Sequence, residues 1–173
     1  ISILDAFNQM VEYYTQYYNH EIIIGKSREV IEKVPFKAFR EAIANALVHR
    51  RWDRESFISV SFYDDKIEIS SPGGLPNGIS EHEYLNRRVS SPRNPIISNL
   101  FFRLRYIEKL GTGIFRIQEA YRESASNPEF EISDNYVTVS LPVTESITID
   151  DISHDSRKIM NILSGNELLS RME

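Results

Sequence analysis

Residues 36–50 read FKAFREAIANALVHR, and this segment has the clearest helical pattern in the chain. Its large apolar side chains recur at steps of three or four residues: Phe36, Phe39, Ile43 and Leu47. That period is typical of an amphipathic helix that packs one face against a core. Pro35 stands just before the segment, where proline suits the start of a helix. The pattern therefore predicts a helix over residues 36–50.

Three polar residues lie at intervals of four along another face of this helix: Glu41, Asn45 and His49. Alanines flank them, so little bulk covers that face. Such a stripe is most often the solvent-exposed side of a helix. The other interpretation is a row of functional groups, and the motifs elsewhere in the chain decide between the two.

The rest of the chain alternates helical and strand patterns. Further helices are expected over residues 3–18, 96–102 and 114–122, and β-hairpins over residues 21–34, 57–70 and 130–141. Four tyrosines widen the apolar stripe of the first helix: Tyr13, Tyr14, Tyr17 and Tyr18. Packing in the core and contact with another domain or a second copy both explain them.

The composition excludes several classes of protein. The 173 residues include no cysteine, which excludes disulfides, thiolate metal sites and cysteine nucleophiles and favours the cytoplasm. No apolar run approaches the roughly 20 residues of a membrane span, so no membrane partner is expected. A net charge of −5 argues against a generally basic nucleic-acid-binding surface.

The charge is unevenly distributed along the chain. Residues 85–118 carry seven basic and one acidic side chain, whereas residues 119–173 carry four basic and eleven acidic ones. A solvated basic face explains this pattern, and so does a segment that meets phosphate.

Glycine clusters occur at two places where a strand or loop gives way to a turn or helix. Gly73-Gly74 follows the hairpin of residues 57–70, and Gly111-Thr112-Gly113 precedes the helix of residues 114–122. Glycine lets backbone N–H groups approach a ligand, and a helix N-terminus favours a phosphate. Each cluster alone is weak evidence, but their order after the Glu41–Asn45 helix is unusual.

Together these motifs resemble those of the GHKL, or Bergerat-fold, ATPases, such as gyrase B, MutL, the large heat-shock chaperones and the histidine-kinase catalytic domain. The resemblance is closest to the ATP-binding domain found beside Schlafen/AlbA-type DNA-binding domains in bacterial and archaeal transcriptional regulators, some labelled RecG-related DNA helicases. It covers residues 34–143, and its motifs lie at residues 40–50, 71–76, 93–95 and 108–117.

The resemblance implies an α/β (α+β) two-layer sandwich, in which helices cover one face of a mixed, mostly antiparallel sheet. The order of predicted helices and hairpins agrees with it independently. The expected domains are an ATP-binding domain over residues 1–143, a linker over residues 144–155, and the start of a further domain, such as a winged helix, over residues 156–173.

The resemblance also implies the site residues. Glu41 would be the general base that orients the attacking water, and Asn45 would offer its side-chain oxygen to Mg²⁺ on the phosphates of ATP. Gly73 and Gly74 would line the nucleotide beside the purine. The remaining groups would meet the phosphates: Lys109, backed by Arg103 or Arg105, and the backbone of Gly111, Thr112 and Gly113.

One position departs from the wider family. An aspartate that reads the adenine amino group normally precedes the first glycine cluster, and here that place falls on Ser70 or Ser71. A hydroxyl is a poorer partner for an amino group than a carboxylate. The change therefore bears on purine specificity and on nucleotide binding itself.

The leading prediction is a Mg²⁺-ATP-binding regulatory domain of a DNA-associated transcriptional regulator, with slow ATP hydrolysis left open and DNA contacted through other domains. The alternative is a degenerate fold that serves as a dimerisation or interaction module without nucleotide. A third interpretation, direct DNA binding by residues 85–118, is disfavoured by their acidic flanks.

Overall fold

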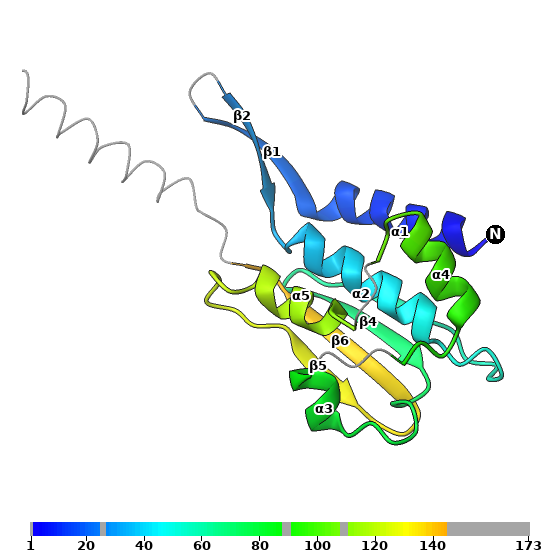
Figure 1. The fold of residues 1–173 in the computed structure, drawn as a ribbon. Helices are drawn as coiled ribbons and strands as arrows, with labels where there is room; N and C mark the ends of the chain where they lie inside the picture. Colours follow the sequence, from blue (N-terminus) through cyan, green and yellow to red (C-terminus); the bar gives the residue numbers. More distant parts are fainter. Residues whose placement is uncertain (1, 25–26, 88–90, 108–110, 145–173) are drawn as a thin grey trace, which may run out of the picture.

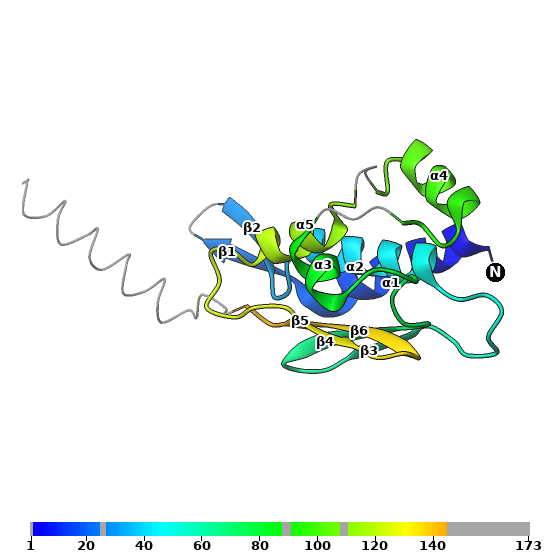
Figure 2. The ribbon, with the colours of Figure 1, turned by 60° about the horizontal axis from the view of Figure 1, so that its bottom comes forward.

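The computed structural model describes residues 2–24, 27–87, 91–107 and 111–144, and its main body has two layers. A four-stranded sheet forms one layer, and the helices lie against a single face of it, as Figures 1 and 2 show. The predicted α+β two-layer sandwich is therefore confirmed. Within the described ranges, no helix is long and apolar enough to cross a membrane.

The sheet has the strand order β3-β4-β6-β5. Its strands are β3 (Ser59–Phe62), β4 (Lys66–Pro72), β5 (Glu129–Ile132) and β6 (Tyr136–Pro142). Each pair of neighbours is antiparallel, so the described strands contain no parallel pair of the kind that a mixed sheet would have.

The two faces of the sheet differ in polarity because side chains alternate along each strand. Ile67, Ile69, Val139 and Leu141 point toward the helices and are buried. The residues between them, such as Glu68, Ser70, Thr138 and Ser140, face away from the helices. The register therefore separates two adjacent serines: Ser70 lies on the outer face and Ser71 on the inner one.

The central helix α2 (Phe36–His49) packs on the inner face of the sheet. It is buried along most of its length, since nine of its residues are buried. The helix predicted over residues 36–50 is confirmed to within one residue. Glu41 is among the buried residues, so the stripe of Glu41, Asn45 and His49 is not a solvent-exposed face.

Helix α1 (Ile3–Tyr18) packs beside α2 and contains the four tyrosines, which fall into a buried and an exposed pair. Tyr14 and Tyr18 are buried, and their hydroxyls donate to the backbone carbonyls of Val34 and of Tyr63 and Lys66 respectively. Tyr13 and Tyr17, by contrast, are 40% and 55% exposed. Two of the tyrosines therefore belong to the core, and two are available at the surface.

Three helices connect β4 to β5: α3 (Glu81–Asn86), α4 (Pro95–Arg103) and α5 (Gly113–Ala120). Helix α3 was not expected from apolar periodicity, because it has only six residues and none is buried. The sequence feature that indicates this helix is its capping box. The Ser80 side chain accepts a hydrogen bond from the Glu83 N–H, and the Glu83 carboxylate accepts one from the Ser80 N–H.

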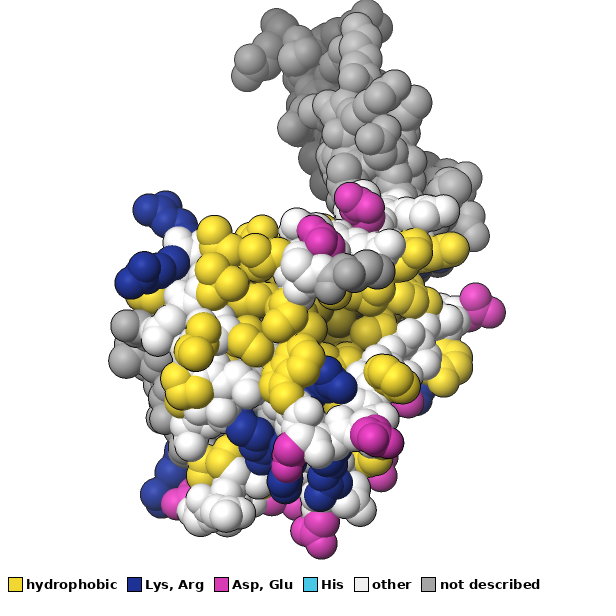
Figure 3. All heavy atoms as spheres, turned by 90° about the vertical axis from the view of Figure 1, so that its right-hand side faces the viewer, with side chains coloured by type: hydrophobic (Ala, Val, Ile, Leu, Met, Phe, Trp, Pro, Cys, Tyr) yellow, Lys and Arg dark blue, Asp and Glu magenta, His cyan; other side chains and the backbone are white. Residues whose placement is uncertain are grey.

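Helix α4 belongs to the core on one side and is exposed on the other. The Phe101 ring packs edge-on against Phe7 and Tyr106, each with a centroid distance of 5.6 Å. Ile96 and Leu100 lie on the solvent side, 85% and 42% exposed. Figure 3 shows this side of the molecule, where hydrophobic side chains gather around a hollow.

The predicted hairpin of residues 21–34 is present as β1 (Asn19–Ile24) and β2 (Ser27–Glu32), a separate two-stranded sheet that projects from the body in Figure 1. Thr144 is the last described residue. The rest of the expected linker and the expected C-terminal segment of residues 156–173 lie outside the described residues.

The turn after α4 makes a testable prediction about stability. Arg105 has a φ of +60°, and the N–H of Tyr106 donates to Phe101 O at 2.8 Å, as in a Schellman motif that usually has glycine at this position. We expect Arg105→Gly to raise the free energy of unfolding by about 0.5 kcal/mol, because relief of the left-handed strain exceeds the entropy that glycine adds to the unfolded chain.

Urea denaturation checks this, with Arg103→Gly in the last turn of α4 as the matched control. That control should lower stability, since its glycine replaces a helical residue. Equal losses in the two variants would show that the φ of Arg105 carries no strain.

Candidate functional site

A cleft lies between α2, the inner face of β4 and β6, and α5. It comprises about 850 Å³ of empty space, its open mouth included. Apolar side chains from the helices and the sheet form much of its lining: Ala42, Ala46, Ile69, Ile114, Ile117, Val137 and Val139. Leu75, Pro76 and Ile79 add to the apolar lining, and polar side chains and glycines complete it. The cleft therefore combines a largely apolar lining with a few polar groups, as small-molecule sites do.

Ser71 lines the cleft, and Ser70 does not. The Ser71 hydroxyl donates to Ala46 O at 3.0 Å and is buried between β4 and α2. The Ser70 hydroxyl is 2.9 Å from Thr138 Oγ1 on the outer face of the sheet. The expectation that placed Ser70 in the site is therefore corrected, because strand alternation turns its side chain away; of the two serines considered, Ser71 is the one that lines the cleft.

The first glycine cluster forms a tight turn at the edge of the cleft. Gly73 has a φ of +103°, which favours glycine, and a Cβ there would lie 2.7 Å from Arg93 Nη1. The Gly73 and Gly74 N–H groups donate to Asn135 O at 2.6 Å and Asp134 O at 3.2 Å in the hairpin between β5 and β6. Both glycines line the cleft, but their N–H groups already have partners.

The second glycine cluster meets α2 at the end of the cleft. A Cβ at Gly113 would overlap Asn45 Nδ2 and would lie 2.9 Å from Glu41 Oε1. Only glycine allows this approach, so the start of α5 lies directly against both polar side chains. The first N–H groups of a helix have no partner within the helix. Backbone donors, a carboxylate and a carboxamide therefore converge at one place.

Glu41 is buried and forms an ion pair with Arg116 of α5, in which Arg116 Nη1 lies 3.5 Å from Glu41 Oε2. A buried carboxylate needs such a partner, because its desolvation is otherwise costly. Glu41 lies beside the cleft rather than in its lining, whereas Asn45, one turn further along α2, lines it.

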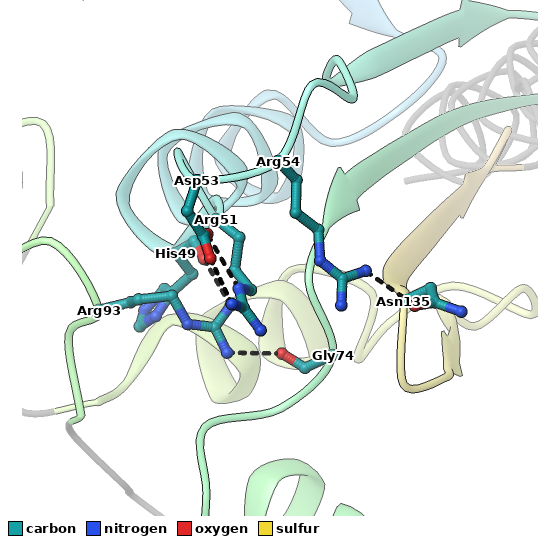
Figure 4. A network of polar contacts seen from close by, with 7 residues as sticks. All are labelled: His49, Arg51, Asp53, Arg54, Gly74, Arg93 and Asn135. Atoms are coloured by element: carbon teal, nitrogen blue, oxygen red, sulfur yellow. Dashed lines mark hydrogen bonds and ion pairs between the residues drawn. The ribbon is translucent and has the colours of Figure 1, made fainter.

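Arg93 and Asn94 bind the last carbonyls of α2, as Figure 4 shows for Arg93. Arg93 donates to His49 O at 3.0 Å and to Gly74 O at 2.9 Å, and Asn94 Nδ2 donates to Val48 O and Arg50 O, both at 2.8 Å. Partial burial lowers the pKa of the Arg93 guanidinium. Through these hydrogen bonds, the two residues connect α2, the glycine turn and α4 at the edge of the cleft.

His49 also lines the cleft, at the end of α2 where Arg93 and Asn94 bind the backbone carbonyls. Burial, and then the charge of Arg93, lower the pKa of His49 to about 4 from the ordinary value of 6.5. His49 is therefore neutral at pH 7 and presents imidazole nitrogens rather than a charge to the cleft.

The pKa of His49 predicts a pH dependence of stability. Between pH 6.5 and pH 4 the unfolded chain binds a proton that the folded chain does not, so His49 lowers the free energy of unfolding progressively as the pH falls through this window. From pH 7.5 to pH 5 we expect a loss of about 2 kcal/mol that His49→Gln abolishes. Urea denaturation of both proteins at the two pH values measures the difference, and parallel losses would contradict an imidazole that stays neutral in the folded chain.

The remaining predicted residues that the structure describes do not all line the cleft. Gly111, with a φ of +61°, lines the cleft, but Thr112 does not and makes no side-chain capping bond to α5. Arg103 and Arg105 are exposed at the end of α4 and do not line the cleft. Lys109 lies outside the described residues.

The described residues contain no group of three or more His, Cys, Asp or Glu that could hold a metal ion. Mg²⁺ commonly takes one or two protein oxygens and completes its shell with water and substrate phosphates. The carboxamide of Asn45, held against the glycine at the start of α5, fits that mode of binding.

Three residues of the site are not predicted by the sequence patterns. Tyr84 of α3 lines the cleft, and the capping box of that helix was its signal. Arg93 and Arg116 lie within the motifs at residues 93–95 and 108–117, but their partners are 44 and 75 positions away in the sequence, so the pattern does not show what they bind.

A family profile described as "Putative ATP-dependent DNA helicase recG C-terminal" matches residues 55–141, about half of the chain. That stretch contains both glycine clusters, Arg93 and Arg116, whereas α2 precedes it. The crystal structure of the DIP2311 protein from Corynebacterium diphtheriae is similar, with a TM-score of 0.72 and 26% sequence identity. The similarity covers 84% of this chain and 30% of that one, so this chain spans less than a third of the DIP2311 protein. No curated protein matches the chain.

Proposed function

Because the chain belongs to the family described as "Putative ATP-dependent DNA helicase recG C-terminal" and contains an ATPase-like domain, we propose that its cleft binds ATP together with Mg²⁺. One observation carries the proposal: Glu41 and Asn45 of α2 meet Gly113 at the N-terminus of α5, beside an apolar cleft. An apolar cleft suits a purine, and a helix N-terminus suits phosphates.

In this proposal the purine base of ATP lies between α2 and the inner face of the sheet, next to Ser71 and the turn at Gly73 and Gly74. The triphosphate extends toward Gly111 and Gly113, where the N–H groups at the start of α5 donate to it. Lys109, which lies outside the described residues, and Thr112 stay proposed contacts of the phosphates.

Asn45 would hold Mg²⁺ through its side-chain oxygen. When bound, the ion would offset the negative charge of the phosphates. Glu41 would accept a proton from the attacking water if the bound ATP is hydrolysed, because its carboxylate lies one helical turn from Asn45 and beside the same glycine.

We further propose that this domain serves as the regulatory module of a longer, DNA-associated transcriptional regulator in the cytoplasm, in which other domains contact DNA. The phrase "ATP-dependent DNA helicase" in the description of the family supports an association with DNA. An alternative, a homodimeric interaction module without nucleotide, is favoured by the exposed Tyr13 and Tyr17 of α1.

The proposal predicts a nucleotide-dependent rise in stability. With Mg²⁺ present and ATP at about 100 times its dissociation constant, the free energy of unfolding should increase by about 2.7 kcal/mol. Thermal unfolding with ATP, ADP and GTP, each with and without Mg²⁺, measures this rise. An unchanged midpoint in every nucleotide, together with a stable dimer in sedimentation, would favour the interaction module instead.

A further inference from the structure

Within the described part of the chain, no carboxylate lines the cleft. The polar side chains that do line it are neutral or cationic: Asn45, His49, Ser71, Tyr84, Ser91 and Arg93. A carboxylate can only accept hydrogen bonds, whereas a hydroxyl or a neutral imidazole can both donate and accept them. The neutral groups of this lining are therefore not restricted to one hydrogen-bonding role.

Two of these neutral side chains, Ser71 and His49, lie at the proposed position of the purine base. The Ser71 hydroxyl donates to Ala46 O, and His49 follows Ala46 by one helical turn on α2, so both side chains line the same part of the cleft. With a pKa of about 4, His49 is uncharged at pH 7. One nitrogen of its ring therefore carries a proton, and the other accepts a hydrogen bond.

The Ser71 hydroxyl can turn without leaving Ala46 O unpaired. Ala46 O also accepts from the Arg50 N–H at 3.1 Å, in the last turn of α2. With its proton on Ala46 O, Ser71 presents an oxygen that accepts from the cleft. With its proton turned into the cleft, the same hydroxyl becomes a donor. The second orientation avoids the cost of an unpaired buried carbonyl, because Arg50 keeps Ala46 O bonded.

The two purines differ in the hydrogen bonds that they require. Adenine has an amino donor at its 6-position, and guanine has a carbonyl acceptor there. The adjacent ring nitrogen differs in the opposite sense, since it accepts in adenine and donates in guanine. A protein group that only accepts therefore favours adenine at the 6-position, and a group that can do both does not choose between the bases.

We propose that the cleft binds adenine and guanine nucleotides alike, because Ser71 and His49 exchange donor and acceptor roles to match either base. This inference rests on the proposed function and widens its ligand class to purine nucleoside triphosphates. With adenine, the Ser71 oxygen accepts from the 6-amino group while its proton stays on Ala46 O. With guanine, the hydroxyl turns and donates to the 6-carbonyl. The imidazole of His49 offers the adjacent ring nitrogen a donor or an acceptor as that base requires.

Calorimetric titrations of the wild-type chain with Mg²⁺-ATP and with Mg²⁺-GTP test the inference first. We expect the two dissociation constants to agree within about tenfold. Titration with ATP in the presence of saturating GTP should show competition, because both nucleotides use the same cleft. A preference of more than about tenfold for either nucleotide, or binding of both at once, would overturn the inference.

Substitutions at Ser71 test the reason for the lack of preference. Ser71→Asp places a group that only accepts in the cleft, so the ratio of ATP affinity to GTP affinity should rise by about 10-fold or more. Ser71→Asn has the same size but can donate and accept, and it should leave the ratio near its wild-type value. Ser70→Asp adds the same charge on the outer face of the sheet and should change neither affinity. Equal ratios in Ser71→Asp and Ser71→Asn would contradict the account.

A smaller change avoids the cost of burying a carboxylate, which threatens the fold of Ser71→Asp. Ser71→Ala removes the hydroxyl, and Ala46 O keeps the Arg50 N–H as its partner. We expect this variant to fold and to bind ATP and GTP more weakly by similar factors, each about threefold or more. A loss confined to one nucleotide would show that Ser71 serves a single base, which would overturn the inference.

The same titrations separate this inference from the proposed function on which it rests. Binding of ATP without binding of GTP would overturn the inference and retain the proposed ATP site. Failure of the folded wild-type chain to bind either nucleotide would instead overturn the proposed function itself.

Discussion

Gly113→Ala is expected to weaken Mg²⁺-ATP binding by about 10-fold or more while leaving the chain folded. The new methyl group would overlap Asn45 Nδ2 and lie 2.9 Å from Glu41 Oε1, so both side chains must move away from the start of α5. These atoms are the ends of side chains, which makes the movement cheap for the fold. Alanine also favours the helix by up to about 1 kcal/mol relative to glycine, which offsets the crowding.

Titration calorimetry with Mg²⁺-ATP and a urea denaturation curve measure the two expectations. Gln118→Ala, an exposed change in the same helix, is the control and should alter neither quantity. Wild-type affinity in Gly113→Ala would mean that the meeting of α2 and α5 is a packing contact without a role in binding the nucleotide.

Asn45→Ala is expected to remove the Mg²⁺ dependence of nucleotide binding. If Asn45 provides the protein oxygen for the ion, the variant should bind ATP about 10-fold more weakly in Mg²⁺ and equally well in EDTA. Asn45 lines the cleft, and the residues directly before and after it on α2 are buried. The substitution therefore removes a functional group with little change to the core.

Asn45→Asp is the matched control, because it replaces the carboxamide with a group of the same shape that still offers oxygen to Mg²⁺. We expect this variant to retain Mg²⁺-dependent affinity. Calorimetric titrations of all three proteins, with Mg²⁺ and with EDTA, provide the comparison. A similar loss in EDTA and in Mg²⁺ would assign Asn45 a direct contact with the nucleotide and no role with the ion.

Much of the fold could be predicted from the sequence because its long elements have strong periodicity. The helices at residues 3–18 and 36–50 and the three hairpins are present, and the alternation of β4 and β6 places a polar face opposite the helices. Helix α3 was not predicted, because its six residues include no buried side chain and therefore show no apolar periodicity.

The site was less predictable, because register and long-range contacts decide it. The sequence could not distinguish Ser70 from Ser71, since that choice depends on how β4 pairs with β6. The spacing of Glu41 and Asn45 gave their common face, but their contact with Gly113 depends on how α2 packs against α5. The carbonyls that Arg93 binds likewise become visible only once the chain is folded.

Direct titration of this chain with ATP at saturating Mg²⁺ tests the central claim that the cleft is a nucleotide site. We expect one ATP per chain, a dissociation constant below about 1 mM, and weaker binding when EDTA replaces Mg²⁺. The absence of binding by a folded chain at millimolar ATP, with or without Mg²⁺, would contradict the claim.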